Sequence, residues 1–311
     1  MRTRLVARAA MLAECRAFFA ARGVLEVETP LLSQGAVTDV HLASLDTQIA
    51  GLAPRYYLQT SPEYAMKRLL AAGAGDCYQI CKVFRDGETG RYHNPEFSML
   101  EWYRLGFDHH ALMTEVESLL VPLLGPDYAR PAQRLSYQAV FEQALGIDPY
   151  TVALAELRTL ALVRAQADLP DADRDTVLDV LMGVVIGPTL GRDRLTFVYD
   201  YPATQAALAR VLPGLPPRAA RFEAYARGLE LCNGFHELAD AAEQRRRFEA
   251  DHRARLERGW PLPPIDERFL AALAVGLPDC AGVAVGLDRV LMIATGATSI
   301  DEVLAFTIAE A

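Results

Sequence analysis

Hydrophobic and polar residues alternate with two different periods near the start of the chain. A helical period runs from about Leu5 to Arg22 and stops at Gly23, a residue that favours helix ends. In the following stretch, VLEVETPLLS, apolar Leu25 and Val27 alternate with glutamates until Pro30. The pattern predicts an amphipathic helix followed by a strand that ends before the proline.

A second strand and a helix are predicted in RYYLQTSPEYAMKRLLAAG. RYYLQT is rich in residues that favour strands, and it leads directly into a helical pattern. Ser61 is expected as the N-cap, with Pro62 at the first helical position, Glu63 in the first turn and Gly73 as the stop.

Two runs with a period of two then flank a polar loop. They are DCYQICKVFRD and FSMLEWYRL, and together they predict an antiparallel hairpin with a long loop. Further on, LTFVYDYP and LELCNGFHEL predict strands, and AGVAVGLDRVLMIATG predicts a strand that turns into a helix. Additional helices are expected at 110–124, 136–145, 154–166, 176–186 and 243–258.

Strands and helices follow each other without settling into a βαβα repeat. This order predicts an α+β fold built on an antiparallel sheet and flanked by helices. No internal repeat or low-complexity tract divides the chain, so we expect a single domain over residues 1–311.

Composition narrows the class of protein. The 311 residues are 51% hydrophobic and 23% charged, as in a folded globular protein, and no apolar run approaches the roughly 20 residues that span a bilayer. The five cysteines are odd in number and scattered, which favours reduced thiols in a cytosolic protein. The net charge of −9 gives no support to a nucleic-acid ligand.

Common nucleotide and metal signatures are absent from the sequence. No GxxxxGK[ST] occurs, and GAGDCY lacks the third glycine of a dinucleotide fingerprint and precedes a strand. HELAD is not the zinc motif HExxH. A nucleotide would therefore bind on another scaffold.

The hairpin loop VFRDGETGRYHNPEF has the chemistry of an anion site. Arg85 and Arg91 could hold a polyphosphate through charge-assisted hydrogen bonds, and the glycines between them would let the backbone approach the ligand. The structural alternative is a loop whose charges are simply solvated. The loop alone does not decide between the two.

The order of the motifs resembles class II aminoacyl-tRNA synthetases of the lysyl branch. VLEVETPLL, FRDGE with GRYHNPEF and MLEWY, ELCNGFHEL and GVAVGLDRVLM appear in the family's sequence order, and the resemblance runs from about Arg8 to Phe306. It implies an antiparallel sheet flanked by helices, a homodimer interface around Pro30, and ATP bound with Mg²⁺ in a bent shape.

The chain departs from lysyl-tRNA synthetases in ways that refine the resemblance. It enters the catalytic motifs within its first residues, so no OB-fold anticodon-binding domain is expected. Ser61 stands where the synthetases have alanine, and Ala284 where they typically have glycine. These features, with YDYPATQAALAR, resemble the truncated paralogs of the branch. That resemblance implies a cytoplasmic, AMP-forming ligase that attaches (R)-β-lysine to a lysine of elongation factor P, without tRNA and without a membrane.

The resemblance also implies roles for individual residues. Arg85 and Arg289 would be catalytic, holding the α-phosphate with the substrate carboxylate and the γ-phosphate, respectively. The other expected nucleotide contacts are Asp86, Gly87, Glu88, Asn94, Glu230, Leu231 and Gly286. The amino acid would contact Ser61, Pro62, Glu63, Glu101, Tyr103, Glu237 and Ala284. Glu230 and Glu237 are the expected Mg²⁺ ligands.

Some of these assignments have structural alternatives. Glu101 and Tyr103 could form an ordinary strand face, and His93 a turn histidine. Gly87 stands where the family usually has the adenine-binding glutamate, with Glu88 one residue later. Glu230 and Glu237 would point to opposite faces of a regular strand, unless a bulge around Asn233-Gly234 turned both toward the site.

Two rival functions remain open from the sequence. One is a compact lysyl-tRNA synthetase, which the missing anticodon module and the acidic charge disfavour. The other is an inactive synthetase-like regulatory subunit that only binds the amino acid. The presence of Arg85, Arg289, Glu230 and Glu237 disfavours that second function.

Overall fold

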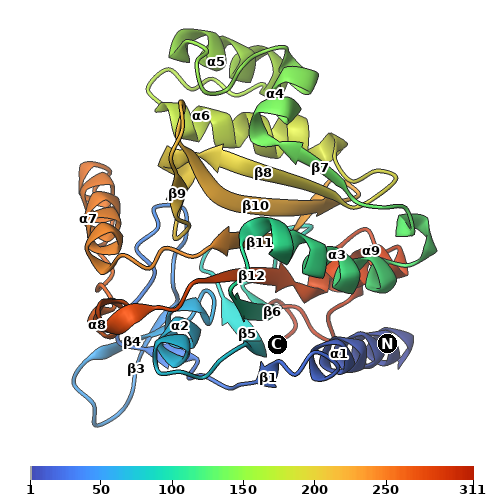
Figure 1. Ribbon diagram of the computed structural model, residues 1–311, viewed down its shortest axis with the longest axis vertical. Helices are drawn as coiled ribbons and strands as arrows, with labels where there is room; N and C mark the ends of the chain where they lie inside the picture. The colour runs from blue at the N-terminus through green and yellow to red at the C-terminus, as the bar shows by residue number, and fades with distance from the viewer. Residues whose placement is uncertain (1) are drawn as a thin grey trace. The chain divides into compact units, whose positions relative to one another are not determined.

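The computed structural model describes residues 2–311, which form two compact units (Figure 1). The first unit contains the chain up to Asp108 and from Glu237 onward, and the second is His109–His236. Each unit is described by itself. The expectation of one domain over residues 1–311 stays a prediction.

In the first unit, the strands of the main sheet follow one another in the order β1-β5-β6-β12. β1 pairs with β5 in parallel, and the other neighbours are antiparallel. A small second sheet has the order β2-β4-β3. The strands are β1 (Leu25–Glu26), β2 (Leu32–Ser33), β3 (Asp46–Gln48), β4 (Arg55–Leu58), β5 (Cys77–Phe84), β6 (Glu96–Leu105) and β12 (Cys280–Gly286). The helices are α1 (Arg2–Ala20), α2 (Glu63–Ala71), α7 (Ala241–Glu257), α8 (Glu267–Gly276), α9 (Leu287–Thr295) and the 3₁₀ turn η6 (Ile300–Glu302).

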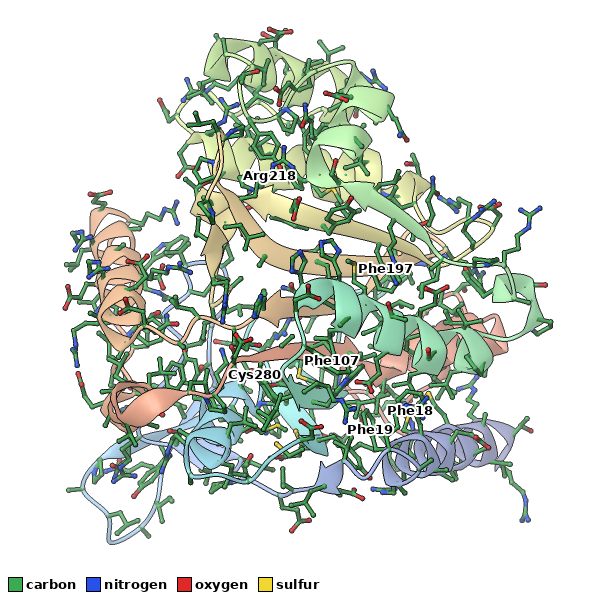
Figure 2. The ribbon with its side chains drawn as sticks, viewed as in Figure 1. Phe18, Phe19, Phe107, Phe197, Arg218 and Cys280 are labelled. Atoms are coloured by element: carbon green, nitrogen blue, oxygen red, sulfur yellow. The ribbon has the colours of Figure 1, made fainter. Side chains whose placement is uncertain are left out.

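Helix α1 covers one face of this sheet through aromatic side chains. Phe19 stacks on Tyr78 of β5 with ring centroids 4.3 Å apart, and meets Trp102 of β6 edge to face at 5.3 Å. Phe19 projects from α1 toward the strands (Figure 2). Because Phe19 and Trp102 are fully buried, this face is a hydrophobic core and the opposite face is left for polar chemistry.

A buried carboxylate fixes the start of α9 to the sheet. Asp288 accepts a hydrogen bond of 2.7 Å from the backbone N–H of Ser98 in β6 and forms an ion pair with Arg8 of α1. The Arg8 guanidinium also donates to the carbonyl of Val303. Asp288 thus joins three elements and sets the position of its neighbour Arg289.

In the second unit, the strands follow one another in the order β11-β10-β8-β7, with β9 paired to β10. The strands are β7 (Gln133–Ser136), β8 (Thr196–Pro202), β9 (Val211–Leu212), β10 (Arg218–Ala226) and β11 (Leu229–His236). The α-helices are α3 (His109–Leu124), α4 (Tyr137–Leu145), α5 (Leu154–Leu160) and α6 (Arg174–Val180). The π-helical turns are η2 (Ala161–Ala165) and η3 (Leu181–Ile186), and the 3₁₀ turns are η1 (Pro126–Tyr128), η4 (Gly187–Thr189) and η5 (Ala203–Gln205).

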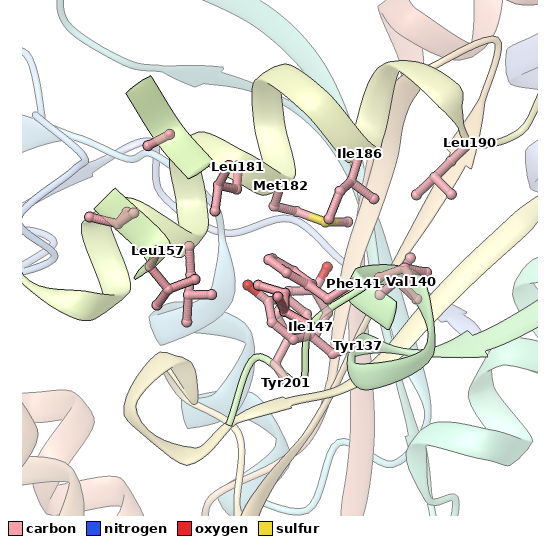
Figure 3. Close-up of a cluster of buried hydrophobic side chains, with 14 of the residues drawn as sticks. Tyr137, Val140, Phe141, Ile147, Leu157, Leu181, Met182, Ile186, Leu190 and Tyr201 are labelled. Atoms are coloured by element: carbon pink, nitrogen blue, oxygen red, sulfur yellow. The ribbon is translucent and has the colours of Figure 1, made fainter. Parts of the chain in front are cut away.

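A separate hydrophobic core holds the second unit together. Tyr137 and Phe141 of α4 pack with Tyr201 of β8, and Leu157 and Leu181 close the cluster from the neighbouring helices (Figure 3). This core has no part in the first unit's sheet, so each unit buries its own apolar side chains.

The α+β class is confirmed, and so is the predicted hairpin. β5 and β6 pair in antiparallel register, with Ile80 opposite Leu100. The sheets are not purely antiparallel, because β1–β5 and β7–β8 are parallel pairs. All five cysteines are free thiols in the structure, which agrees with the predicted absence of disulfides, and the cytosolic location stays a prediction. No helix in the described residues is long and apolar enough to cross a membrane.

Several local predictions are wrong in detail. Pro62, rather than Ser61, is the N-cap of α2. Ser61 precedes the N-cap, and its hydroxyl accepts a hydrogen bond of 3.3 Å from the backbone N–H of Glu63. The strand predicted from Leu25 keeps only two residues in the sheet. The helices expected at 154–166 and 176–186 both change from α to π geometry in their last turns.

We predict that Asp288→Ala destabilises the protein by about 2–3 kcal/mol, because it leaves the buried N–H of Ser98 and the guanidinium of Arg8 without their acceptor. The urea midpoint measures the change, with the exposed Asp171→Ala as the matched control. Equal midpoints for the two variants would show that Asp288 does not organise this part of the fold.

Candidate active site

The polar face of β6 carries the candidate site. Side chains alternate along a strand, so Phe97, Met99, Glu101 and Tyr103 share the face opposite the one that carries Trp102. Glu101 and Tyr103 are each only 2% exposed. The Tyr103 hydroxyl donates to Glu101 Oε1 at 2.7 Å, so the two predicted pocket residues are bonded to each other.

A buried lysine organises the carboxylates of this pocket. Lys67 of α2 is fully buried, and its Nζ lies 2.6 Å from Glu63 Oε1 and 2.5 Å from Glu237 Oε2. Glu237 is 1% exposed, and it lies just after β11 rather than on that strand, contrary to the sequence prediction. Three of the predicted carboxylates, Glu63, Glu101 and Glu237, therefore gather around an ammonium group that the sequence analysis did not single out.

Burial and mutual repulsion govern the protonation of these groups. Burial raises the pKa of Glu101 well above its usual value, and the charges of Glu63 and Glu237 add to the effect. Burial also raises the pKa of Glu237, to about 7, although the Lys67 ammonium opposes the change. Burial would lower the pKa of Lys67, but Glu237 and Glu63 together raise it, so Lys67 stays charged.

Two small residues of β12 line the pocket. Gly282 pairs with Tyr103 and Ala284 with Glu101 in the antiparallel register. A Cβ on Gly282 would run into the Tyr103 ring and lie 2.6 Å from Glu237 Oε1. The backbone N–H of Gly282 also donates to Glu237. Glycine is therefore required at position 282 for the pocket to keep its shape.

An arginine with an unused donor lies on the same face, nearer the hairpin loop. The Arg85 guanidinium lies over the Phe97 ring, 5.1 Å from its centroid, and is 3.5 Å from Glu88 Oε1. Its buried Nε–H donates to no acceptor among residues 2–311. A buried guanidinium N–H without an acceptor is suited to a carboxylate or phosphate ligand.

A second arginine is held beside the loop by a histidine. Arg289 donates from a terminal nitrogen to His93 Nε2 at 2.7 Å and from Nε to the carbonyl of Tyr92 at 3.5 Å. Partial burial, followed in effect by the charge of Arg289, lowers the pKa of His93, although the charge of Glu88 opposes the change. His93 is thus a neutral acceptor that orients Arg289, rather than an isolated turn residue.

The two charged ends of the site are separated along β6. Phe97, under Arg85, and Glu101 are four residues apart, or about 13 Å at ~3.3 Å per residue. Cationic groups therefore lie toward the loop and carboxylates toward Tyr103, on one face of one sheet. This polarity complements a molecule with an anionic group at one end and ammonium groups at the other.

The remaining predicted ATP contacts of the first unit lie around the loop. Asp86 and Gly87 are exposed, and Gly87 has a φ of 76°, which favours glycine. Asn94 is 7% exposed, and both ends of its amide are used: Nδ2 donates to the Glu96 carbonyl at 2.6 Å, and Oδ1 accepts from the N–H of Ile308 at 3.1 Å. Gly286 is the N-cap of α9. Their nucleotide roles stay predictions.

In the second unit, Glu230 and Leu231 lie at an irregularity of β11. Glu230 pairs with Tyr225 and Cys232 with Ala224, so Leu231 is the extra residue of a bulge. The bulge predicted at Asn233-Gly234 is therefore wrong in position, since both residues pair regularly with β10. The observed bulge at Leu231 nevertheless puts the Glu230 side chain on the face of β11 that carries Asn233, because one extra residue reverses the alternation of side chains along the strand.

Comparison with known proteins gives the family. A model described as tRNA synthetases class II (D, K and N) matches residues 1–310. The chain belongs to this class II synthetase family. Similar curated proteins are named "Elongation factor P--(R)-beta-lysine ligase". Those from Klebsiella pneumoniae subsp. pneumoniae, Klebsiella pneumoniae strain 342 and Salmonella paratyphi B are 53%, 52% and 50% identical over 98% of this chain and 94% of their own length. The resemblance inferred from the motifs is thereby confirmed.

The class II fold implies that ATP is used. The two residues expected to bind Mg²⁺, Glu237 and Glu230, differ in how well they suit the metal. Glu237 is a poor ligand for the metal, because Lys67 already neutralises it at 2.5 Å. The half-buried carboxylate of Glu230 fits better. Among residues 2–311, no group of three or more His, Cys, Asp or Glu side chains is arranged to hold a metal. Mg²⁺ commonly uses only one or two carboxylates together with phosphate oxygens.

Sequence reasoning missed three residues that shape the site: Lys67, Gly282 and Asp288. One signal for Lys67 was available. Of the 31 basic residues, only Lys67 and Lys82 are lysines, so a lysine on an otherwise apolar helix face next to Met66 and Leu70 was unusual for this chain. No comparable signal marked Gly282 or Asp288, whose importance depends on contacts distant in sequence.

We predict that Glu101→Gln stabilises the protein more at about pH 8 than at about pH 5. In the wild type, the raised pKa means that the folded state keeps a proton that the unfolded state releases above its pKa of about 4.3, so stability falls as pH rises through this window. Glutamine removes that dependence. Urea midpoints at both pH values measure it, with the exposed Glu249→Gln as control, and parallel pH curves for wild type and Glu101→Gln would contradict it.

Proposed function

We propose that this protein activates (R)-β-lysine with ATP and transfers it to the ε-amino group of a lysine on elongation factor P. The observation that carries the proposal is the 50–53% identity, over almost the whole chain, with proteins named for that ligation. The polarity of the site supports it, because cations at one end and carboxylates at the other complement an amino acid with two ammonium groups.

In the first step, the substrate carboxylate attacks the α-phosphorus of ATP. It is ionised at neutral pH, since its reference pKa is about 3.5, so no general base is required. A bond forms between the carboxylate oxygen and phosphorus, and pyrophosphate leaves. Arg85 would hold both reactants and neutralise the charge that accumulates, while Arg289, oriented by His93, would hold the terminal phosphate.

In the second step, the acceptor amine attacks the carbonyl carbon of the mixed anhydride. An amide forms, AMP leaves, and the amine loses a proton to solvent or to a base. Because the reference pKa of a lysine is about 10.4, only a small fraction of acceptor amines is neutral at pH 7. This favours a site that holds the adenylate until a neutral amine arrives.

The remaining residues divide between the two substrates. Glu63, Glu101, Tyr103 and Glu237 would receive the ammonium groups, with Ser61, Pro62 and Ala284 shaping the rest of the pocket. Asp86, Gly87, Glu88, Asn94, Leu231 and Gly286 would contact ATP. Mg²⁺, held by Glu230 and phosphate oxygens, would supply further charge neutralisation.

We propose elongation factor P rather than tRNA as the acceptor and (R)-β-lysine rather than α-lysine as the amino acid. The names of the relatives support the acceptor, and the net charge of −9 offers no general attraction for RNA. Ala284 lies opposite Glu101 on the pocket face, where its methyl group narrows the space around the carboxylate. That position supports discrimination between lysine isomers.

The first test is ATP–pyrophosphate exchange with (R)-β-lysine and α-lysine in parallel, followed by intact mass of elongation factor P and by charging of total tRNA. We expect preferential exchange with β-lysine and a mass gain of one β-lysyl unit on the factor. Arg85→Met serves as the inactive control, because it removes the guanidinium without a large change in volume.

Other outcomes would point to the rival functions. Exchange with α-lysine, together with tRNA charging and no mass gain, would indicate a synthetase. Absence of exchange with either amino acid in the wild type would indicate a binding subunit.

We also propose a cytoplasmic homodimer that associates around Pro30. Leu25 and Leu31, on either side of Pro30, are 55% and 37% exposed. Exposed apolar side chains of this size are suited to burial against a partner subunit. Sedimentation at micromolar concentration is expected to give twice the mass of 34.2 kDa, and Leu31→Glu is expected to yield monomer. A wild-type monomer at that concentration would exclude the dimer.

A further inference from the structure

The two lysines of the chain occupy opposite environments. Lys82 lies on β5 with its side chain 45% exposed, 3.5 Å from Glu96. Lys67 has no exposed surface and lies among the carboxylates of the site. All other basic positions counted among the 31 are arginines. Lys67 is therefore a buried position at which this chain uses a compact ammonium group instead of a guanidinium.

Lys67 is not needed to fill space. Its neighbours on the buried face of α2 are Met66 and Leu70, and a methionine has nearly the length of a lysine stem. Replacing a buried ion pair by apolar residues of similar volume is often neutral or stabilising. An apolar cluster could therefore be equally stable, so stability alone does not explain why this group of buried charges is present.

The contacts show which groups the charge acts on. The ammonium binds Glu63 and Glu237 but forms no hydrogen bond with Glu101. Glu101 Oε1 accepts from the Tyr103 hydroxyl, and its buried Oε2 accepts from no residue within 2–311. One carboxylate oxygen in the pocket is thus buried and lacks a donor, which is costly unless a ligand supplies one.

We propose that Lys67 is a positioning residue of the amino-acid pocket: it holds Glu63 and Glu237 in place as carboxylates, which leaves the pocket with the charge to receive two ammonium groups. Before an amino acid binds, burial keeps Glu101 protonated. Once a bound ammonium group has displaced that proton, three carboxylates and one ammonium leave an excess of two negative charges. A diamino acid matches that excess and a monoamino acid does not. The inference rests on the proposed function, since it concerns the same amino-acid pocket.

The charged and titratable groups facing Lys67 are Glu63 from its own helix, Glu101 and Tyr103 from β6, and Glu237 after β11. Without the ammonium, the three carboxylates would repel one another in a buried space and take up protons more readily. A protonated carboxyl group binds a substrate ammonium more weakly than a carboxylate does. Loss of Lys67 would therefore weaken amino-acid binding, most strongly at lower pH.

The test compares Lys67→Met with Lys82→Met in the full chain. Titration calorimetry measures the Kd for (R)-β-lysine, α-lysine, norleucine and ATP between about pH 6.5 and pH 9. For Lys67→Met we expect the Kd of the better-bound lysine isomer to rise by at least about tenfold, with the Kd for ATP changed less than about twofold. The decline in affinity at low pH should begin at higher pH than in the wild type, and Lys82→Met should match the wild type throughout.

A second variant keeps the inference testable if Lys67→Met does not fold. The double variant Glu63→Gln with Lys67→Met removes one charge of each sign, so the buried net charge is conserved. We expect it to fold and to bind the diamino acid at least about tenfold more weakly than Glu63→Gln alone. Equal affinities of the double and single variants would overturn the inference.

The remaining outcomes also decide. A folded Lys67→Met with unchanged Kd and pH profile would overturn the role of Lys67, as would an equal loss of affinity for ATP and amino acid, which would indicate collapse of the whole site. Binding of norleucine as tight as that of the lysine isomers by the wild type would overturn the charge argument. A wild type that binds a diamino acid but never modifies elongation factor P would refute only the proposed function.

Discussion

The alternation of side chains along β6 is the constraint on which the first unit depends. On one face of the strand, Trp102 packs against Phe19. The backbone N–H of Ser98 donates to Asp288. The other face carries Phe97, Glu101 and Tyr103. A shift of one residue in the pairing with β5 or β12 would put a glutamate into the aromatic core. The same register that builds the core therefore aligns the two charged ends of the site.

The polar face can exist only because its charges are matched. Glu101 and Glu237 are nearly without solvent contact, and such carboxylates are unfavourable unless hydrogen-bonded or paired. Lys67, Tyr103 and the N–H of Gly282 provide part of that stabilisation. They leave the buried Glu101 Oε2 without a hydrogen-bond donor, and a cationic substrate can supply one. Unpaired polar atoms of this kind are typical of binding sites, because a site whose polar atoms were all paired within the protein would have none left to bind the ligand.

Much of this arrangement was predictable from the sequence, for a physical reason. Periodicity fixed the β5–β6 hairpin and the strand-to-helix turn at Gly286, since local alternation records which face is buried. The motifs then singled out Glu101, Tyr103, Arg85 and Arg289, which lie at the candidate site, and their roles stay predictions. β10 and α8 were not predicted at all. β10, RAARFEAYA, has apolar residues on both faces and so lacks a clear period of two. The bulge at Leu231 and the N-cap at Pro62 depend on partners distant in the chain or on fine backbone geometry.

The choice of cation differs between the two ends of the site, and the difference follows from what each end must bind. Arg85 and Arg289 present planar groups with several donors, which suit carboxylate and phosphate oxygens arriving from different directions. At the other end, a diamino acid would itself bring the cations, and the protein's own cation would only have to balance carboxylates in a crowded space. A guanidinium there would compete with the substrate for Glu101, because its fork of donors reaches further than a single ammonium. Lys67 bonds two carboxylates and leaves the third, which is the property the pocket requires.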